Sequence, residues 1–488
     1  MSQQPDKFEG SSASITDEQK AKLKLLFPEI ITEGGKIDFD RLKLTLGESV
    51  DVGKERYGMN WPGKADCFKT IQKPSMATLV PARDESVNFD TTENLIIEGD
   101  NLETLKLLQK AYLGKVKMVF IDPPYNTGND FIYPDDFSES LETYLRYTGQ
   151  VDNEGRKFST NTEADGRFHS KWMNMMYPRL FLARNLLRQD GIMFVSIDDA
   201  EYDNLKKIGN EVFGEENFIG TVVWQHSIQP KGYTGKFSVH HNYILCFRKS
   251  DAFDLANLER TEEHNKSYSN PDNDPKGEWR AGDVRNALYR PNLIYDIITP
   301  SGKTISPPPN GWRWSKETVQ KKIATGEIKF SPDEARIIRK IYLNDLDGRT
   351  PETIWFGKDV GTTRDAAAEL KDLFDGSAPF DTPKPVQLIR HMLQLGTDSE
   401  GENIVLDFFA GSGTTAHGVL EQNHEDGGNR KFVLVQLPES TAKADFPTIA
   451  DIAIERVRRV INKLQTADNQ LSLDEKKKQD FGFKVFKL

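Results

Sequence analysis

Short runs of consecutive apolar residues alternate with longer amphipathic stretches between residues 95 and 249. The runs show no polar alternation, which is typical of strands that are buried on both faces of a parallel sheet. The stretches between them repeat their apolar residues with helical spacing. In one of these helices we expect a kink or a boundary at Pro178 and the C-terminal end at Gly191. We expect strands at residues 94–100, 116–122, 192–199 and 241–249, and helices at residues 101–113, 171–191 and 201–214.

The same alternation resumes from residue 380. Neither half of the chain contains enough strands for a sheet of its own. Both halves are therefore expected to contribute to one doubly wound α/β sheet with helices on both faces. In the second half we expect a helix at residues 384–396, a strand at 403–407, a helix at 414–423 and a strand at 431–439.

Two other regions depart from this pattern. The N-terminal region should be mostly helical after a disordered start, with amphipathic helices at residues 16–30, capped by Thr16, and at 36–47. The region between the two halves is rich in turn-forming residues and breaks the alternation. The expected domains are an N-terminal region (1–94), a first half of the sheet domain (95–249), an insert (250–379) and a second half (380–488).

The composition excludes several classes of protein. A length of 488 residues is too great for one ordinary core and suggests several domains. Two cysteines, Cys67 and Cys246, cannot form a disulfide framework or a cysteine-rich metal site, and no other motif predicts a metal. No apolar run is long enough to cross a bilayer, and the first residues lack the apolar core of a secretion signal. A cytoplasmic location is the simplest interpretation.

The net charge of −11 argues weakly against nucleic acid as a partner, but the distribution of charge matters more than its sum. Between residues 280 and 350, thirteen Lys and Arg stand against eight Asp and Glu, which leaves this window at about +5. Aromatic residues, including Trp312 and Trp314, are interleaved with the basic ones. The window suits contacts with nucleic acid, and it suits equally well a solvated surface over a small core.

A glycine-rich loop follows the expected strand that ends at Asp407. Gly411 and Gly413 allow the backbone to turn tightly and a ligand to approach. Thr414 begins a helix whose free N–H groups would face an anionic group. Glu439 ends the next strand, at a position where an acid commonly binds ribose hydroxyls. These features predict a bound cofactor and leave NAD, a flavin and S-adenosylmethionine open; the alternative is a tight turn that binds no ligand.

The expected strand at 116–122 ends in an acid, two prolines and an aromatic residue: Asp122, Pro123, Pro124 and Tyr125. In a doubly wound sheet this end shares a rim with the glycine loop. Prolines have no N–H, so the turn offers carbonyl acceptors without competing donors, next to a carboxylate. An exocyclic amino group on a base needs such acceptors, and Tyr125 can stack on the base. The alternative is a proline-terminated strand with a surface tyrosine.

The motifs DPPY at 122–125 and DFFAGSGTT at 407–415 resemble those of the amino-methylating DNA methyltransferases. Their order, with an insert between them, is similar to the β-type permutation of that family. The resemblance implies a circularly permuted, Rossmann-like, doubly wound mixed sheet of the S-adenosylmethionine-dependent methyltransferase type. The resemblance is closer still to the modification subunits of type III restriction–modification systems, and it covers residues 23–488. The segments that carry it are ERYGMNWPGK, TTENLIIEGDNLETLKLLQ, FHSKWMNMMYPRL, FVSIDDAE, EVFGEENFIG, TPKPVQLI and EDGGNRKFVLVQLPE.

The resemblance implies S-adenosylmethionine as the cofactor and the N6 amino group of adenine as the acceptor, after the base is flipped out of the duplex. Asp122 and the Pro123 carbonyl would hold the amino group while Tyr125 stacks on the base, and no metal is needed. The implied cofactor residues are Phe408, Gly411 and Gly413 at the methionine part, Glu439 at the ribose, Asp100 near the adenine ring, and Lys384 and Pro385 at the carboxylate end, beside Asp407 and Thr414 of the same loop.

The resemblance also implies partners. The insert would be a target recognition domain on double-stranded DNA, and cleavage would need a separate restriction subunit with helicase and nuclease activity. Family members usually continue into a C-terminal segment used in dimerisation and partner contact, whereas this sequence ends at Leu488, so a homodimer stays an open expectation. Two alternative functions are an N4-cytosine methyltransferase, which has the same amino-group chemistry, and a DNA-specificity subunit without catalysis.

Overall fold

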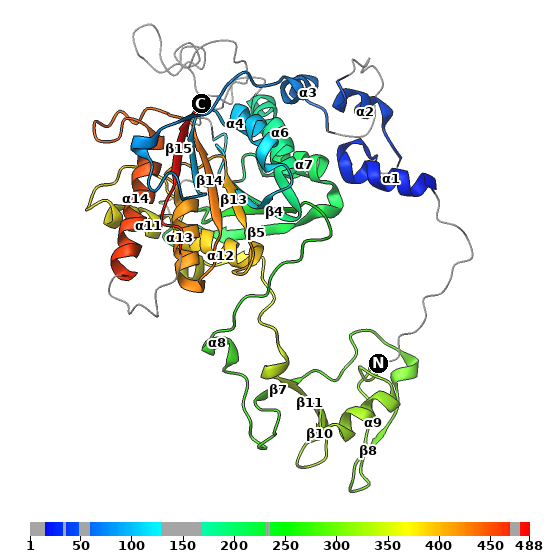
Figure 1. Cartoon of the computed structure of the whole chain (residues 1–488). Helices are drawn as coiled ribbons and strands as arrows, with labels where there is room; N and C mark the ends of the chain where they lie inside the picture. The colour runs from blue at the N-terminus through cyan, green and yellow to red at the C-terminus, as the bar shows by residue number, and fades with distance from the viewer. Residues whose placement is uncertain are drawn as a thin grey trace. The chain divides into compact units, whose positions relative to one another are not determined.

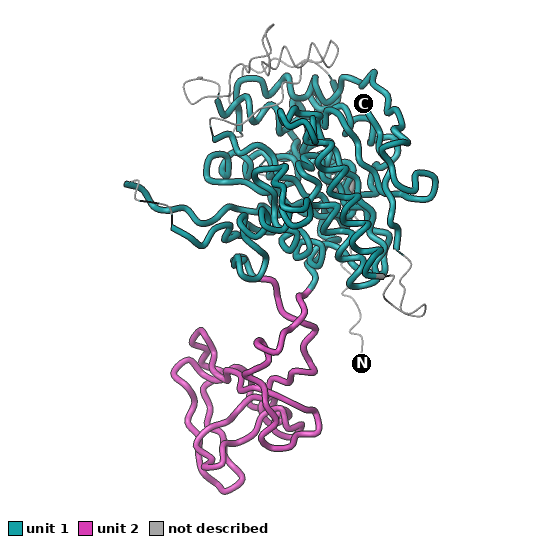
Figure 2. The backbone as a smooth tube through the Cα atoms, turned by 90° about the vertical axis from the view of Figure 1, so that its left-hand side faces the viewer, with its two compact units in different colours: residues 1–256, 352–488 teal, residues 257–351 magenta. Residues whose placement is uncertain are grey.

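The computed structural model describes residues 15–32, 36–47, 59–127, 168–230, 232, 235–468 and 479–488 of the chain. The chain forms two compact units (Figure 2). Unit 1 combines Met1–Ala256 with Glu352–Leu488, and unit 2 is Asn257–Pro351. Unit 2 thus occupies the middle of the region expected as an insert, while the residues on either side of it belong to unit 1.

A mixed β-sheet forms the centre of unit 1 (Figure 1). Its middle joins the two halves of the chain, because Leu406 pairs in parallel with Val119. The prediction that both halves build one doubly wound α/β sheet is confirmed. Within the described residues the strands are, in order across the sheet, β1 (Val80–Pro81), β15 (Lys484–Lys487), β2 (Leu95–Glu98), β14 (Lys431–Gln436), β13 (Ile404–Asp407), β3 (Val116–Ile121), β4 (Leu187–Ile197), β6 (His241–Arg248), β5 (Phe218–Gln225) and β12 (Ile354–Trp355).

Two groups of helices pack among themselves on unit 1 (Figure 1). One group is α3 (Lys64–Gln72), α4 (Asn101–Tyr112), α6 (Phe168–Leu186) and α7 (Tyr202–Phe213). The other group is α11 (Thr363–Leu373), α12 (Val386–Gly396), α13 (Thr414–Asp426) and α14 (Ile449–Asp468).

Neighbouring residues of β4 face these different helix groups. Met193 belongs to a buried cluster that contains Trp172 of α6. Ile192, the residue before it, lies so close to Gly396 of α12 that an added Cβ would stand 2.9 Å from its Cγ2. Because successive side chains of a strand point to opposite faces, both faces of the central sheet are covered, which explains the unbroken apolar runs.

The boundary between α6 and β4 differs from the expectation. The helix ends at Leu186 rather than at Gly191, which lies inside β4, so the predicted helix end was wrong. The pairing of Leu187 with Val116 overrides the helical pattern of this segment. Pro178 lies within α6 and has no N–H for the carbonyl four residues earlier. The Cys67 thiol approaches that carbonyl, on Asn174, with an Sγ–O distance of 3.8 Å.

The direction of β6 also differs from the expectation. Its apolar run suggested a parallel strand, but β6 runs antiparallel to both β4 and β5. No described helix separates β5 from β6, and strands joined without a helical crossover run antiparallel. Strands β5, β12 and β15 and helices α11 and α14 were not expected from the sequence.

The N-terminal helices of the structure are α1 (Ile15–Leu26) and α2 (Phe39–Thr45). They correspond to the two helices expected there, although Thr16 lies inside the first turn of α1 rather than at its cap. Asp38 caps α2 by accepting from the N–H groups of Asp40 and Arg41. None of the helices in the described ranges is long and apolar enough to cross a bilayer.

Unit 2 has its own small core under an antiparallel sheet of β10 (Ile328–Phe330), β11 (Ile337–Tyr342) and β7 (Trp279–Gly282). Two lysines of this sheet hold a turn-rich loop, because Lys329 and Lys340 each pair with Asp272 at 2.8 Å. Lys340 also pairs with Asp274. The core residues are Ile297, Ile305, Trp312, Val319, Ile328 and Ile337.

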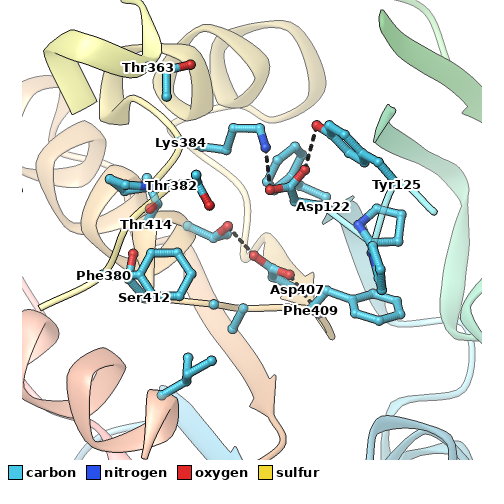
Figure 3. Close-up of a pocket in the computed structure, with 18 of the residues that line it drawn as sticks. Asp122, Tyr125, Thr363, Phe380, Thr382, Lys384, Asp407, Phe409, Ser412 and Thr414 are labelled. Carbon is cyan, nitrogen blue, oxygen red and sulfur yellow. Dashed lines mark hydrogen bonds and ion pairs between the residues drawn. The ribbon is translucent and has the colours of Figure 1, made fainter. Parts of the chain in front are cut away.

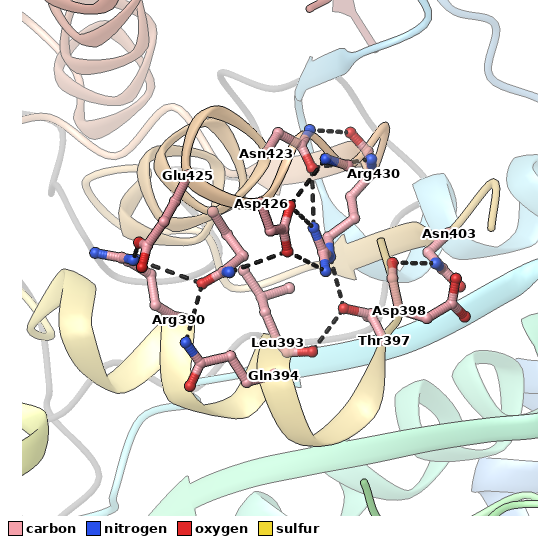
Figure 4. A network of polar contacts seen from close by, with 12 residues as sticks. Arg390, Leu393, Gln394, Thr397, Asp398, Asn403, Asn423, Glu425, Asp426 and Arg430 are labelled. Carbon is pink, nitrogen blue, oxygen red and sulfur yellow. Dashed lines mark hydrogen bonds and ion pairs between the residues drawn. The ribbon is translucent and has the colours of Figure 1, made fainter. Parts of the chain in front are cut away.

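A buried arginine, Arg430, joins three elements of unit 1 (Figure 4). Its Nη1 and Nη2 donate to the two carboxylate oxygens of Asp426, in α13, at 3.0 and 2.9 Å. Its Nε donates to the hydroxyl of Thr397, which caps α12, at 2.7 Å. The side-chain amide of Asn423 bonds both the N–H and the carbonyl of Arg430, directly before β14. These contacts fix the ends of α12 and α13 against the start of β14.

We expect Arg430→Met to lower the free energy of unfolding by about 3 kcal/mol, since it leaves Asp426 without its bidentate partner. Arg83→Met is the control, because the Arg83–Asp90 pair is exposed and should contribute about 1 kcal/mol or less. Urea unfolding of both variants measures the difference. Equal stability of the two variants would show that the network at Arg430 adds nothing beyond a surface ion pair.

Candidate active site

A cavity of about 550 Å³ opens in unit 1 at the rim of the sheet (Figure 3). Asp122 follows β3, Asp407 ends β13, and Glu439 follows β14. These three strands are parallel neighbours, so their carboxyl ends meet at one edge. The cavity is lined by Phe120, Asp122, Pro123, Pro124, Tyr125, Thr127, Trp224, His226, Asn242, Thr363, Phe380, Thr382, Pro383, Lys384, Asp407, Phe409, Ala410, Gly411, Ser412, Thr414, Thr415, Gln436, Glu439 and Ile449.

The Asp122 carboxylate is held from two sides (Figure 3). The Tyr125 hydroxyl donates to its Oδ1 at 2.9 Å, and the Lys384 ammonium pairs with its Oδ2. Ser196 Oγ lies 2.7 Å from the Tyr125 oxygen, and Lys384 Nζ lies 5.2 Å from the centre of the Tyr125 ring. Burial, and then the charge of Asp122, raise the pKa of Tyr125 well above its ordinary value. Tyr125 is therefore a neutral donor that fixes the direction of the carboxylate.

The proline turn after Asp122 is anchored by hydrogen bonds to Trp172 and Glu201. Trp172 Nε1 donates to the Pro124 carbonyl at 2.7 Å, which leaves the Pro123 carbonyl as the other acceptor of the two prolines. Asn126 takes a left-handed backbone conformation, with φ of 61°, and its buried side chain donates to Glu201 Oε1. Glu201 is itself buried at the N-terminus of α7. The proline turn is thus a rigid element rather than a surface loop.

Sequence reasoning assigned no role to the residues that anchor this turn. Ser196 and Glu201 both lie in the segment FVSIDDAE, and Trp172 lies in FHSKWMNMMYPRL. Both segments contributed to the family resemblance, but their side chains meet the proline turn only through the fold. A polar residue within an apolar strand, such as Ser196, was the available signal.

The glycine loop has the conformation that its glycines allow. Gly411 has φ of 53°, and its N–H donates to Gln436 Oε1 at 2.7 Å. Gly413 has φ of 78° and caps α13, and a Cβ there would stand 3.2 Å from the Ala453 carbonyl oxygen. The loop therefore needs glycine at 411 for its backbone and at 413 also for its close approach to α14.

Asp407 holds the glycine loop through both of its oxygens. Its Oδ1 accepts from the Phe409 N–H at 3.0 Å, and its Oδ2 accepts from the Thr415 hydroxyl at 2.5 Å. The side chain is buried, and burial raises the pKa of the Asp407 carboxyl to about 7. Asp407 therefore stabilises the conformation of the glycine loop by accepting hydrogen bonds from two of its residues.

The structure brings most of the candidate residues from the sequence to this cavity. Asp122, Pro123, Pro124, Tyr125, Lys384, Asp407, Gly411, Thr414 and Glu439 all line it. Four other candidates do not line it. Asp100 caps α4, and its carboxylate lies 3.6 Å from Arg179. Phe408 is buried in the core, and Pro385 precedes α12. Gly413 faces α14.

One wall of the cavity comes from residues that the sequence did not single out. Trp224 and His226 lie at the end of β5, and Asn242 lies at the start of β6. Trp224 Nε1 donates to the Gly361 carbonyl at 3.0 Å, which fixes the ring. Because β5 was not recognised as a strand, nothing in the sequence placed these side chains beside Asp122.

Comparison with known proteins identifies the relatives of this chain. A family model described as DNA methylase matches residues 116–443. The chain is 34% identical over 475 residues to the type III restriction-modification enzyme StyLTI Mod subunit of Salmonella typhimurium, covering 94% of this chain and 70% of that one. It is 32% identical over 526 residues to the EcoP15I Mod subunit of Escherichia coli, covering 97% and 78%. A DNA modification methylase of Thermus thermophilus, solved with S-adenosyl-L-methionine, is similar at 13% identity with a TM-score of 0.34, covering 80% and 99%.

Ionisation of Asp407 should cost stability. A carboxyl whose pKa is about 7 when folded and about 3.8 when unfolded stabilises the fold at low pH, and that contribution is lost as the pH rises from about 4 through 7. We therefore expect the stability of the wild type relative to Asp407→Asn to fall by a few kcal/mol between pH 5 and pH 8, at about 1.4 kcal/mol per pKa unit. Urea unfolding of both proteins across this range measures it. A constant difference would mean that the pKa of Asp407 is not raised.

Proposed function

This chain belongs to the DNA methylase family, among the Mod subunits of type III restriction-modification enzymes, and we propose that it methylates the N6 amino group of adenine in a short DNA recognition sequence. We propose S-adenosylmethionine as the cofactor, on the motifs DPPY and DFFAGSGTT and on membership of this family. The observation that supports the proposal most is the pairing of two motifs across one cavity. The Asp122 turn offers acceptors at one side, and the glycine loop at the other side opens a helix N-terminus.

The Asp122 turn suits an exocyclic amino group. The Asp122 carboxylate accepts one amino hydrogen and the Pro123 carbonyl accepts the other, which directs the nitrogen lone pair into the cavity. Each carboxylate oxygen has two lone pairs, so Asp122 can accept a further hydrogen while it is bonded to Tyr125 and Lys384. The anchored turn holds these acceptors in place before the base arrives. The cofactor supplies an electrophilic methyl group on a sulfonium sulfur.

The target base is first extruded from the duplex and is then held in the site by stacking. A flipped adenine gives the site access to an amino group that pairing would otherwise hide. Tyr125 is the proposed stacking partner, a contact worth about 1–3 kcal/mol. Its hydroxyl contacts to Asp122 and Ser196 fix the orientation of the ring. The reaction requires neither a metal nor a covalent enzyme intermediate.

The roles of the cofactor residues are part of the proposal. Motif positions support Phe408, Gly411 and Gly413 at the methionine part and Glu439 at the ribose. They also support Asp100 near the adenine ring, and Lys384 and Pro385 at the carboxylate end. Gly411, Lys384 and Glu439 line the cavity, where the Lys384 ammonium pairs with Asp122.

We propose unit 2 as the target recognition domain and double-stranded DNA as its partner. Exposed apolar and basic side chains stand together in its sequence at Leu288, Tyr289 and Arg290, with Leu288 70% and Tyr289 64% exposed. Such side chains suit contacts with base edges and phosphates. A separate restriction subunit would perform cleavage. Methylome sequencing of cells that express the chain would report the recognition sequence, and light scattering would report whether the purified chain dimerises.

We expect Asp122→Ala to lower the rate of methyl transfer by about 100-fold or more, because the amino group loses its charged acceptor. Affinity for S-adenosylmethionine should change by less than about threefold. Tritium transfer from the cofactor to DNA and calorimetric titration measure the two effects, with Asp90→Ala as an exposed control. Mass spectrometry of the DNA should find N6-methyladenine. Methylcytosine alone would contradict the adenine assignment, and wild-type binding of both ligands without transfer would favour a specificity subunit.

Glu201→Gln should slow methyl transfer by about tenfold without weakening cofactor binding. The substitution keeps the size of the side chain, but it removes the charged acceptor of Asn126 and loosens the proline turn. Steady-state kinetics should show the loss in kcat, while titration with S-adenosylhomocysteine is unchanged. Glu215→Gln, at an exposed position after α7, is the matched control. An unchanged kcat would mean that the buried carboxylate does not position the turn.

A further inference from the structure

Arg456, in helix α14, contacts the glycine loop from behind. Its side chain is fully buried, and the sequence did not mark it. Its Nη1 donates to Ser412 Oγ at 3.0 Å and to Thr414 Oγ1 at 2.7 Å. Ser412 and Thr414 both line the cavity, whereas Arg456 does not. The two hydroxyls therefore stand between a buried cation and the space where a ligand would bind.

The contact with Arg456 decides the direction of both hydroxyl groups. A hydroxyl has one hydrogen to donate and two lone pairs, whereas a guanidinium can only donate. The hydrogens of Ser412 and Thr414 must therefore point away from Arg456. Neither hydroxyl donates to a protein acceptor in the described part of the chain. Donation from a cation also polarises the hydroxyl that accepts it, which strengthens its own hydrogen as a donor.

Arg456 is oriented by His417 and stays charged at neutral pH although it is buried. Its Nε donates to His417 Nδ1 at 3.3 Å, so His417 carries its hydrogen on Nε2, which lies 3.1 Å from Glu421 Oε1. Burial lowers the pKa of His417 to about 4 and the pKa of Arg456 to about 10, so at neutral pH Arg456 is charged and His417 is neutral. Glu369 and Glu421 act on Arg456 through their charges. Within the described residues Arg456 forms no ion pair, and its Nη2 has no hydrogen-bond partner.

The start of α13 adds to the same electrostatic field. Gly413 caps this helix without a side chain, so no capping side chain occupies the first N–H groups. A helix N-terminus favours an anionic group. Two hydroxyl donors, the free N–H groups and the buried cation thus all favour one negative charge at the loop side of the cavity.

We propose that Arg456 is a positioning residue that directs the Ser412 and Thr414 hydroxyls to the carboxylate of the amino-acid part of S-adenosylmethionine. The proposal rests on the proposed function, which supplies the cofactor. Arg456 acts through the two hydroxyls and does not touch the ligand. The effect of losing it should therefore depend on whether the ligand carries a carboxylate, which a general role in folding would not produce.

The test compares two ligands in calorimetric titrations of the full chain. One is S-adenosylhomocysteine, and the other is the same molecule without its carboxylate. The wild type should bind S-adenosylhomocysteine at least tenfold more tightly than the decarboxylated ligand. Arg456→Met should weaken S-adenosylhomocysteine about tenfold and the decarboxylated ligand less than twofold. Arg456→Lys should restore part of the preference, because an ammonium keeps the charge and has hydrogens for both hydroxyls, as Nη1 does, but it lacks the Nε–H that holds the guanidinium on His417.

Arg459→Met is the matched control, since Arg459 lies on the same helix and pairs with Glu455 and Asp375 near the surface. It should leave both affinities unchanged. Thermal unfolding of each variant reports whether it folds. If Arg456→Met does not fold, Ser412→Ala decides, because it keeps Arg456 and should weaken only S-adenosylhomocysteine, by about fivefold.

Equal weakening of both ligands by Arg456→Met, or no weakening of either, would overturn the proposal. A wild type that binds S-adenosylhomocysteine but shows no preference for its carboxylate would overturn it as well. A wild type that binds neither ligand, whether or not DNA is present, would instead contradict the proposed function. The two failures are therefore distinguishable in one set of titrations.

Discussion

The parallel pairing of β3 with β13 is the contact on which the candidate site depends. It joins Val119 to Leu406, two residues from opposite halves of the chain. Each strand then ends within a few residues in a functional motif, at Asp122 and at Asp407. Because parallel neighbours end at the same edge, this single register places the acceptor turn and the glycine loop on one cavity. A shift of register would move both motifs relative to each other, so the buried apolar residues of the two strands also determine the geometry of the site.

The polar groups around this register form a second, supporting layer. Glu201, Asp407 and Arg456 are each buried, and each bonds a segment of the cavity wall rather than the open space. Burying such groups costs free energy unless they are satisfied, and in return they restrict the loops to one conformation. Rigid loops suit a reaction in which the protein contributes mainly the position of an amino group and a methyl donor. The chemistry that the site can perform follows from this preorganisation.

The position of unit 2 in the chain explains how the sheet tolerates it. Unit 2 leaves unit 1 after Ala256 and returns at Glu352. The returning chain forms β12, which pairs with Val223 and Trp224 of β5 at the edge of the sheet. Unit 2 is inserted in the chain between β6 and β12, and neither strand takes part in the pairing of β3 with β13. A turn-rich sequence can therefore vary there while this pairing is preserved.

The sequence by itself determined the doubly wound sheet, the two motifs at strand ends and the family resemblance. These follow from apolar runs, from prolines without N–H groups and from glycines with positive φ, all of which are local properties. Only the tertiary structure decided where β4 begins, that β6 runs antiparallel, and that Trp224 forms a wall of the site. It alone showed that Arg456 donates to Ser412, and that Glu201 accepts from Asn126 at the end of the proline turn. These contacts join side chains that are distant in sequence, and a local pattern carries no record of which distant residue a buried polar group will meet.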